Sequence, residues 1–126
     1  MTELRRLTWV GHSTVIIELD GMRLLTDPLL RRRVMHLLRS GPAPEVLDVD
    51  AIAVSHAHWD HLDLRSLRLV GKDKPVIAPR GLHALLRNAG FTQIVELEVG
   101  ESFGLGPVEI EATHAEHDLG WPRRSR

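Results

Sequence analysis

The sequence predicts a single layered α/β domain over residues 1–126. Short apolar runs rich in β-branched residues alternate along the chain with segments whose apolar residues recur every three or four positions. Glycine, proline and aspartate mark most of the boundaries between these segments. No internal repeat, low-complexity tract or linker interrupts the pattern, so one domain is expected.

A β-hairpin is predicted near the start of the chain. Residues 14–19 form a β-branched run, and Asp20-Gly21 after it is a strong two-residue turn signal. Residues 22–26 are then the returning strand. A looser apolar alternation over residues 4–10 predicts one more strand before this hairpin.

A helix is predicted over residues 29–40, after Asp27-Pro28 ends the hairpin. The apolar residues of this segment are spaced by four, three and four positions, which places them on one helical face. The three arginines at 31–33 lie mostly off that face, where solvent would surround them.

Strands and helices alternate through the second half of the chain. Residues 51–55 are apolar without alternation, which is typical of a strand covered on both faces. The remaining predicted elements are, in order, a helix over 63–70 capped by Asp63, a strand over 75–78, a helix over 81–89 ended by Gly90, and strands over 93–97, 101–105 and 108–113.

The composition excludes several classes of protein. Charged residues are 26% and hydrophobic residues 43%, which argues against a disordered chain. Lys+Arg number 16 and Asp+Glu 17, so a net charge of −1 gives no support to a nucleic-acid partner. No run approaches the roughly 18 apolar residues of a membrane span, and without an apolar signal core we expect a cytoplasmic protein. Cysteine is absent, which rules out disulfides and zinc–thiolate sites.

Four candidate metal ligands lie within six residues: His56, His58, Asp60 and His61. Because residues two apart in an extended segment point the same way, His56 and His58 can converge on one point after the strand over 51–55. The turn into the next helix can carry Asp60 and His61 towards a neighbouring point. Neutral imidazoles and a carboxylate suit zinc-like metals, and such a cysteine-free site is more often catalytic than structural. The alternative is a surface loop that gathers histidines by chance.

The cluster resembles a family signature. Residues 56–61, His-Ala-His-Trp-Asp-His, match the H-x-H-x-D-H motif of the metallo-β-lactamase superfamily. Residues 9–13, 25–28, 54–55 and 62–63 resemble one branch of it, which includes bacterial ascorbate-6-phosphate lactonase and the N-acylphosphatidylethanolamine-hydrolysing phospholipase D type. The resemblance implies an αββα sandwich of four layers and two similar halves.

The resemblance also implies a ligand set. His56, His58 and a later histidine would hold the first metal site of the family, and Asp60 and His61 would contribute to the second. The later histidine is read as His117. The implied cofactor is Zn²⁺, with Mn²⁺ as the alternative, as one or two ions.

Three further positions are left open by the same resemblance. His117 is favoured over His114 because Ala-Glu-His at 115–117 looks like the alanine-x-histidine element of this branch. His12 either faces the metal cleft or hydrogen-bonds to backbone in a turn. Asp27 either orients a ligand histidine or caps the turn before proline. The remaining histidines are read as structural or surface residues: His36 and His83.

The resemblance covers only the first half of the family domain. The second half of that domain supplies a bridging aspartate and a final histidine, but here no aspartate follows Asp118 and no histidine follows His117. We therefore expect a sandwich truncated to its N-terminal half. Its open apolar sheet face would be covered by another chain or by self-association.

The implied function is a metal-dependent hydrolase of a small-molecule substrate. Zinc or manganese would lower the pKa of bound water to about 7, and the water would cleave an ester, lactone, amide or phosphodiester. Asp60 would be the catalytic residue that orients this water or accepts its proton. The alternatives are a truncated, non-catalytic metal-binding fragment and, less favoured without a flavin-binding partner domain, a redox use of the ligands with iron. Weak turnover at best is expected from these residues alone.

Overall fold

The computed structural model describes residues 5–11, 13–30, 48–56 and 62–113, together with the backbone of 33–34 and 37–38. A mixed six-stranded sheet has the order β1-β2-β3-β6-β7-β8. Its strands are β1 (Arg5–Gly11), β2 (Thr14–Leu19), β3 (Met22–Thr26), β6 (Ala51–Ala53), β7 (Val76–Pro79) and β8 (Ile94–Leu97). The first three pair antiparallel, and β3, β6, β7 and β8 pair parallel.

The predicted hairpin is confirmed at β2 and β3. Leu19 pairs with Met22 across the turn. Both turn residues have positive φ, 51° at Asp20 and 84° at Gly21. This conformation matches the right-handed twist of the flanking strands, and aspartate followed by glycine is a pair of residues that adopts it readily.

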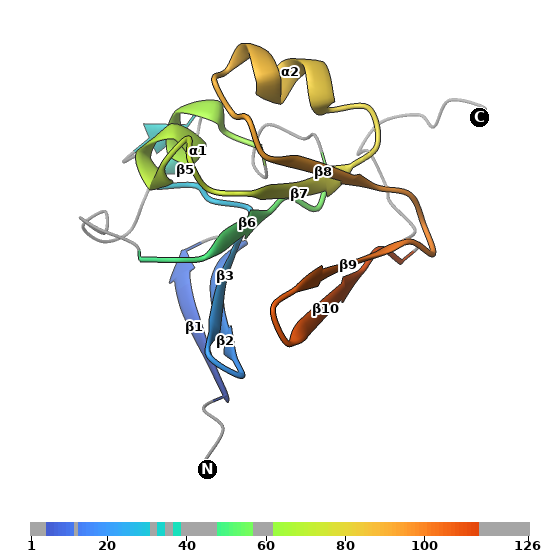
Figure 1. Cartoon of the computed structure of the whole chain (residues 1–126). Coiled ribbons are helices and arrows are strands. Elements are labelled where there is room, and N and C mark those ends of the chain that lie inside the picture. Colours follow the sequence, from blue (N-terminus) through green and yellow to red (C-terminus); the bar gives the residue numbers. More distant parts are fainter. Residues whose placement is uncertain are drawn as a thin grey trace, which may run out of the picture.

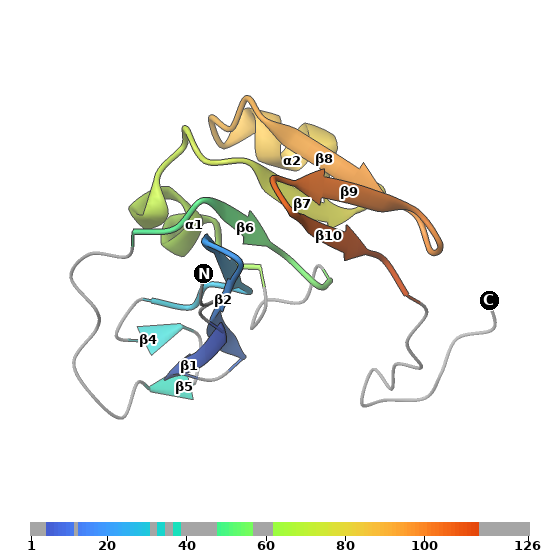
Figure 2. The same ribbon diagram turned by 60° about the horizontal axis from the view of Figure 1, so that its bottom comes forward.

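The central strands are buried on both faces, as the unalternating run over 51–55 predicts. One face packs under the helices α1 (Leu64–Val70) and α2 (His83–Asn88), with Ile52 and Leu86 in a shared apolar cluster. The other face packs against a hairpin of β9 (Ser102–Leu105) and β10 (Val108–Glu111). Figure 1 and Figure 2 show the helices and this hairpin on opposite sides of β6–β8. Neither helix in the described part of the chain is long and apolar enough to span a membrane.

The sheet face opposite the helices is covered only in part. Over β6–β8, the β9–β10 hairpin contributes Phe103 and Ile110 to an apolar cluster with Ile77. Over β1 the side chains stay open to solvent, with Leu7 73% and Trp9 68% exposed. The expectation of a wholly open inner face therefore needs correction, because the hairpin covers the parallel strands and leaves the antiparallel edge exposed.

The predicted helix over residues 29–40 is wrong. The described backbone there forms two short strands, β4 (Arg33–Val34) and β5 (Leu37–Leu38), which pair antiparallel. The preceding residues, Leu29 and Leu30, are both buried and bond to different elements. The Leu29 N–H donates to Thr14 Oγ1 at 2.9 Å, and the Leu30 N–H donates to Ser66 Oγ at 2.8 Å. These contacts hold the chain between β2 and α1, so tertiary context overrides a weak helical periodicity.

The other two predicted helices are confirmed, but α2, His83–Asn88, is shorter than the predicted range 81–89. Asp63 caps α1, because its Oδ2 accepts hydrogen bonds from the N–H and the hydroxyl of Ser66. Helix α2 has no capping side chain of its own. Instead, Glu96 Oε2 of β8 accepts from the N–H of Gly81 at 2.6 Å and the N–H of His83 at 3.1 Å. A carboxylate from the neighbouring strand thus satisfies amides at the start of α2.

Adjacent leucines of α2 test how the helix contributes to the core. Leu86 is fully buried, whereas Leu85 is 42% exposed. We expect Leu86→Ala to lower the free energy of unfolding by about 2–5 kcal/mol, because it removes buried methyl groups and leaves a cavity. Leu85→Ala, the matched control, should cost about 0.5 kcal/mol or less. Urea denaturation of both variants measures the difference, and equal losses would contradict the packing described here.

The Glu96 carboxylate makes the stability of α2 dependent on pH. The N–H of Gly81 holds the pKa of Glu96 below its ordinary value of 4.5, outweighing desolvation, and His83 lowers this pKa further. Because the folded-state pKa is depressed, the stabilisation is present above the unfolded pKa and is lost as pH falls through the folded pKa. Glu96→Gln should therefore destabilise the protein at about pH 7, and this loss should become smaller as the pH falls below 4.5 and through the folded pKa. Urea midpoints at about pH 7 and at a series of lower pH values, with the exposed Glu109→Gln as control, measure this; a loss independent of pH would contradict it.

Candidate functional site

Two polar segments meet where the parallel strands β3 and β6 end. Thr26 and Ala53, the last residues of the two strands, are partners in the register. The carboxyl ends of parallel strands lie at the same edge of a sheet, so the residues that follow are neighbours. The N–H of Asp27 donates to the carbonyl of Ala53 at 2.8 Å, which fixes the two segments against each other.

A chain of hydrogen bonds runs from Asp27 through Ser55 to His56. Asp27 is buried, at 5% exposure. Its Oδ1 accepts from the N–H of Ser55 at 2.6 Å, and its Oδ2 accepts from the Ser55 hydroxyl at 2.7 Å. The Ser55 Oγ in turn lies 2.8 Å from Nδ1 of His56. The Asp27 carboxylate therefore reaches His56 through the Ser55 side chain. This is the kind of contact expected if Asp27 orients a ligand histidine.

The backbone of Asp27 is held in an uncommon conformation. Its φ is +40°, a left-handed value that few residues other than glycine adopt, although aspartate does so more often than most. The buried Thr14 supports it, because Thr14 Oγ1 donates to the Asp27 carbonyl at 2.8 Å and accepts from the N–H of Leu29. Such strain persists where the surroundings over-determine it, and it is concentrated at functional sites.

Only one predicted metal ligand lies among the described residues. His56 follows β6 as predicted, with its Nε2 atom buried. Six other candidates lie outside the described residues: His12, His58, Asp60, His61, His114 and His117. Within the described ranges, no three His, Cys, Asp or Glu side chains gather as a metal site would require. His56 fits a metal ligand, since one ring nitrogen has a polar partner and imidazole suits zinc-like ions; the full ligand set stays a prediction.

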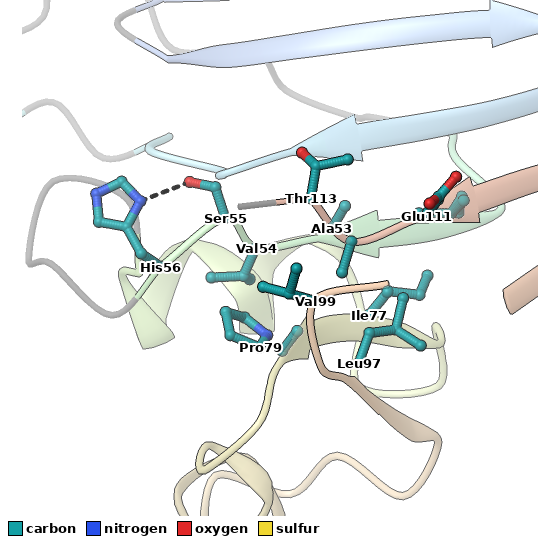
Figure 3. A pocket seen from close by; sticks show the side chains of 13 residues that line it. Ala53, Val54, Ser55, His56, Ile77, Pro79, Leu97, Val99, Glu111 and Thr113 are labelled. Atoms are coloured by element: carbon teal, nitrogen blue, oxygen red, sulfur yellow. Dashed lines mark hydrogen bonds between the residues drawn. The ribbon is translucent and has the colours of Figure 1, made fainter. Parts of the chain in front are cut away.

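A cavity of about 700 Å³ opens beside this network. Its walls come from the ends of β6, β7 and β8 and from the strand β10 with the residues after it. The lining is mostly apolar, and its polar members are Ser55, His56, Glu111 and Thr113. In Figure 3, His56 lies towards one end of the labelled side chains and Glu111 towards the other, with Val99 and Leu97 between them. The imidazole therefore sits at the edge of a mostly apolar cavity.

Ser55 and the cavity walls are features that the sequence pattern does not identify. Ser55 reads as the end of an apolar strand, and only its place between a buried strand and the first histidine hints at a role. The walls supplied by Val99 and Ile110 depend on how the β9–β10 hairpin folds back over the sheet. His83, by contrast, is exposed on α2, consistent with its interpretation as a surface residue.

Comparison with known proteins gives relatives of this chain. An uncharacterized protein of Mycobacterium tuberculosis is 38% identical over 90% of this chain. The mitochondrial N-acyl-phosphatidylethanolamine-hydrolyzing phospholipase D of Saccharomyces cerevisiae is 36% identical over 94% of the chain. A metal-dependent hydrolase of Methanopyrus kandleri is 27% identical over 89%. The chain spans 34%, 28% and 47% of these relatives, so it corresponds to a part of each.

Two solved structures share the fold. The isothiocyanate hydrolase from Delia radicum gut bacteria matches with a TM-score of 0.63 and 27% identity, over 77% of this chain and 43% of its own. The diiron β-hydroxylase CmlA from Streptomyces venezuelae matches with the same TM-score and identity, over 86% of this chain and 23% of its own. The αββα-type fold expected from the sequence is thus shown. This chain corresponds to a part of each of those two chains.

The family assignment rests on the family model and the relatives together. The model of the beta-lactamase superfamily domain matches residues 22–126, most of the chain. The relatives from Mycobacterium tuberculosis and Saccharomyces cerevisiae, both above 30% identity, cover 90% and 94% of it. The H-x-H-x-D-H motif that begins at His56 is the residue pattern from which the same family is expected. The chain therefore belongs to the metallo-β-lactamase superfamily.

Proposed function

We propose that this chain is the metal-binding part of a metal-dependent hydrolase acting on a small molecule. The observation that carries the proposal is His56, held by Ser55 and Asp27 at the edge of the cavity beside β6. The names of similar proteins support hydrolysis, among them the metal-dependent hydrolase of Methanopyrus kandleri and the isothiocyanate hydrolase. A cytoplasmic location stays a prediction.

His56, His58 and His117 would hold one ion, and Asp60 and His61 would contribute to a second. Zn²⁺ is the proposed ion and Mn²⁺ the alternative. Such an ion supplies a Lewis acid that polarises the scissile group and makes water more acidic. The role assigned to Asp60 is to orient that water or to accept its proton.

The cavity suggests how the substrate is held. Its apolar walls, such as Ile77, Leu97 and Val99, would bind an apolar part of the substrate and exclude water from the reacting group. Thr113 and Glu111 are the polar side chains on the β10 side of the cavity. An ester, lactone, amide or phosphodiester with an apolar substituent is therefore the proposed substrate class.

A redox function with iron is the second candidate. The likeness to CmlA, a diiron β-hydroxylase, is the observation that favours it. The same His and Asp side chains can bind iron as well as zinc, so donor type does not separate the two functions. Turnover with zinc and no iron present would favour hydrolysis.

Zinc titration of the purified chain tests the ligand set. We expect His58→Ala and His117→Ala each to weaken zinc binding by more than about 100-fold, because each removes a direct ligand. His114→Ala, the matched control for His117, should change the affinity by less than about 3-fold. Isothermal titration calorimetry measures both. A larger loss in His114→Ala than in His117→Ala would reverse the assignment of the third ligand.

Hydrolysis of generic substrates tests the activity. With added Zn²⁺ or Mn²⁺, we expect slow release of p-nitrophenol from p-nitrophenyl esters or from bis(p-nitrophenyl) phosphate. The rate should fall to background in His58→Ala and stay unchanged in His83→Ala, where an exposed histidine of α2 is removed. Metal uptake without any turnover above His58→Ala would overturn the hydrolase proposal and favour a non-catalytic metal-binding module.

A further inference from the structure

We infer that Asp27, acting through Ser55, fixes the tautomer of His56, so that Nδ1 carries the proton and Nε2 is the nitrogen presented to a metal. The inference rests on the proposed function, because only there is His56 a metal ligand. Asp27 is therefore a positioning residue. Three hydrogen bonds joining Asp27, Ser55 and His56 support the inference.

The direction of each hydrogen bond follows from counting protons. As a carboxylate, Asp27 only accepts, so the Ser55 hydroxyl must donate its hydrogen to Oδ2 over the 2.7 Å between them. A serine hydroxyl has one hydrogen, so none is left for the contact with His56. Ser55 Oγ can therefore only accept from Nδ1 at 2.8 Å, and Nδ1 must be the protonated nitrogen. In a neutral imidazole the lone pair then lies on Nε2.

The Ser55 hydroxyl cannot easily turn from Asp27 to donate to His56. Its backbone N–H also donates to Asp27, through Oδ1 at 2.6 Å, so the carboxylate binds Ser55 at two points. Asp27 itself is held by Ala53 at its N–H and by Thr14 at its carbonyl. Two strand ends and the buried Thr14 thus set the orientation of the carboxylate, and the carboxylate sets that of the hydroxyl.

A fixed tautomer matters for metal affinity. A ligand histidine whose second nitrogen donates to a hydrogen-bond acceptor is oriented before the metal arrives, and loss of such a partner typically costs about 10–100-fold in affinity. Without the acceptor, the imidazole divides between two tautomers and more than one ring orientation. The Asp27–Ser55 pair would hold the imidazole in one tautomer and one orientation, and so avoid this loss of metal affinity.

The tautomer can be measured in the metal-free protein. Long-range ¹H–¹⁵N correlation spectra distinguish the two neutral tautomers of each histidine, and the His56 signals are identified by their absence in His56→Gln. We expect the Nδ1–H form of His56 to predominate in the wild-type chain. A predominant Nε2–H form would overturn the inference. This readout needs neither metal nor turnover, so failure of the proposed hydrolase leaves it intact.

Asp27→Asn reverses the expected bond directions. The amide can donate to Ser55 Oγ, which would turn the hydroxyl towards Nδ1 and move the proton to Nε2. We expect the His56 signals to shift to the Nε2–H form and zinc affinity to fall about 10–100-fold. Asp73→Asn, a change at an exposed aspartate, should alter neither reading. An unchanged tautomer in folded Asp27→Asn would contradict the inference.

Ser55→Ala provides an independent variant if Asp27→Asn does not fold. Ser55 is exposed, so its loss is expected to leave the fold intact. The variant removes the acceptor of Nδ1, and the His56 signals should then report a mixture of both tautomers. Ser55→Thr keeps the hydroxyl and should restore the Nδ1–H form. A pure Nδ1–H form in Ser55→Ala would show that Ser55 does not set the tautomer.

Discussion

The parallel pairing of β3 with β6 positions both the core and the candidate site. It joins the antiparallel strands at the start of the chain to the parallel strands that follow, with Leu25 opposite Ile52 in the register. Both residues are fully buried, so the junction lies inside the core. It also sets the two strand ends side by side, and the contact between Asp27 and Ser55 follows directly from that placement.

The layers around this junction give the site its surroundings. Helices α1 and α2 cover one face of the parallel strands, and the β9–β10 hairpin packs on the other. The cavity lies between the strand ends and the hairpin, so its walls are apolar side chains that already belong to the core. A polar network at the rim of an apolar cavity can bind a charged ion and an apolar substrate side by side, as the proposed hydrolase requires.

Local signals in the sequence predict local structure well here. Asp20-Gly21 predicts the hairpin turn and Asp63 the cap of α1, because both effects act within a few residues. The helix expected over residues 29–40 failed because distant side chains, Thr14 and Ser66, bind the chain at Leu29 and Leu30. Of the candidate site, His56 follows β6 as expected from the motif, and the other predicted ligands lie outside the described residues. Ser55 could not be foreseen, because its role depends on Asp27, which lies 28 positions earlier in the chain.

Zinc K-edge X-ray absorption of the metal-loaded chain tests whether His56 is a metal ligand held by Asp27 and Ser55. We expect imidazole nitrogens at about 2.0–2.1 Å from the zinc in the wild-type chain. In His56→Ala the multiple-scattering features of the imidazole rings should decrease by the share of one histidine. Identical spectra for the two proteins, or a shell of oxygen atoms without imidazole, would contradict the account.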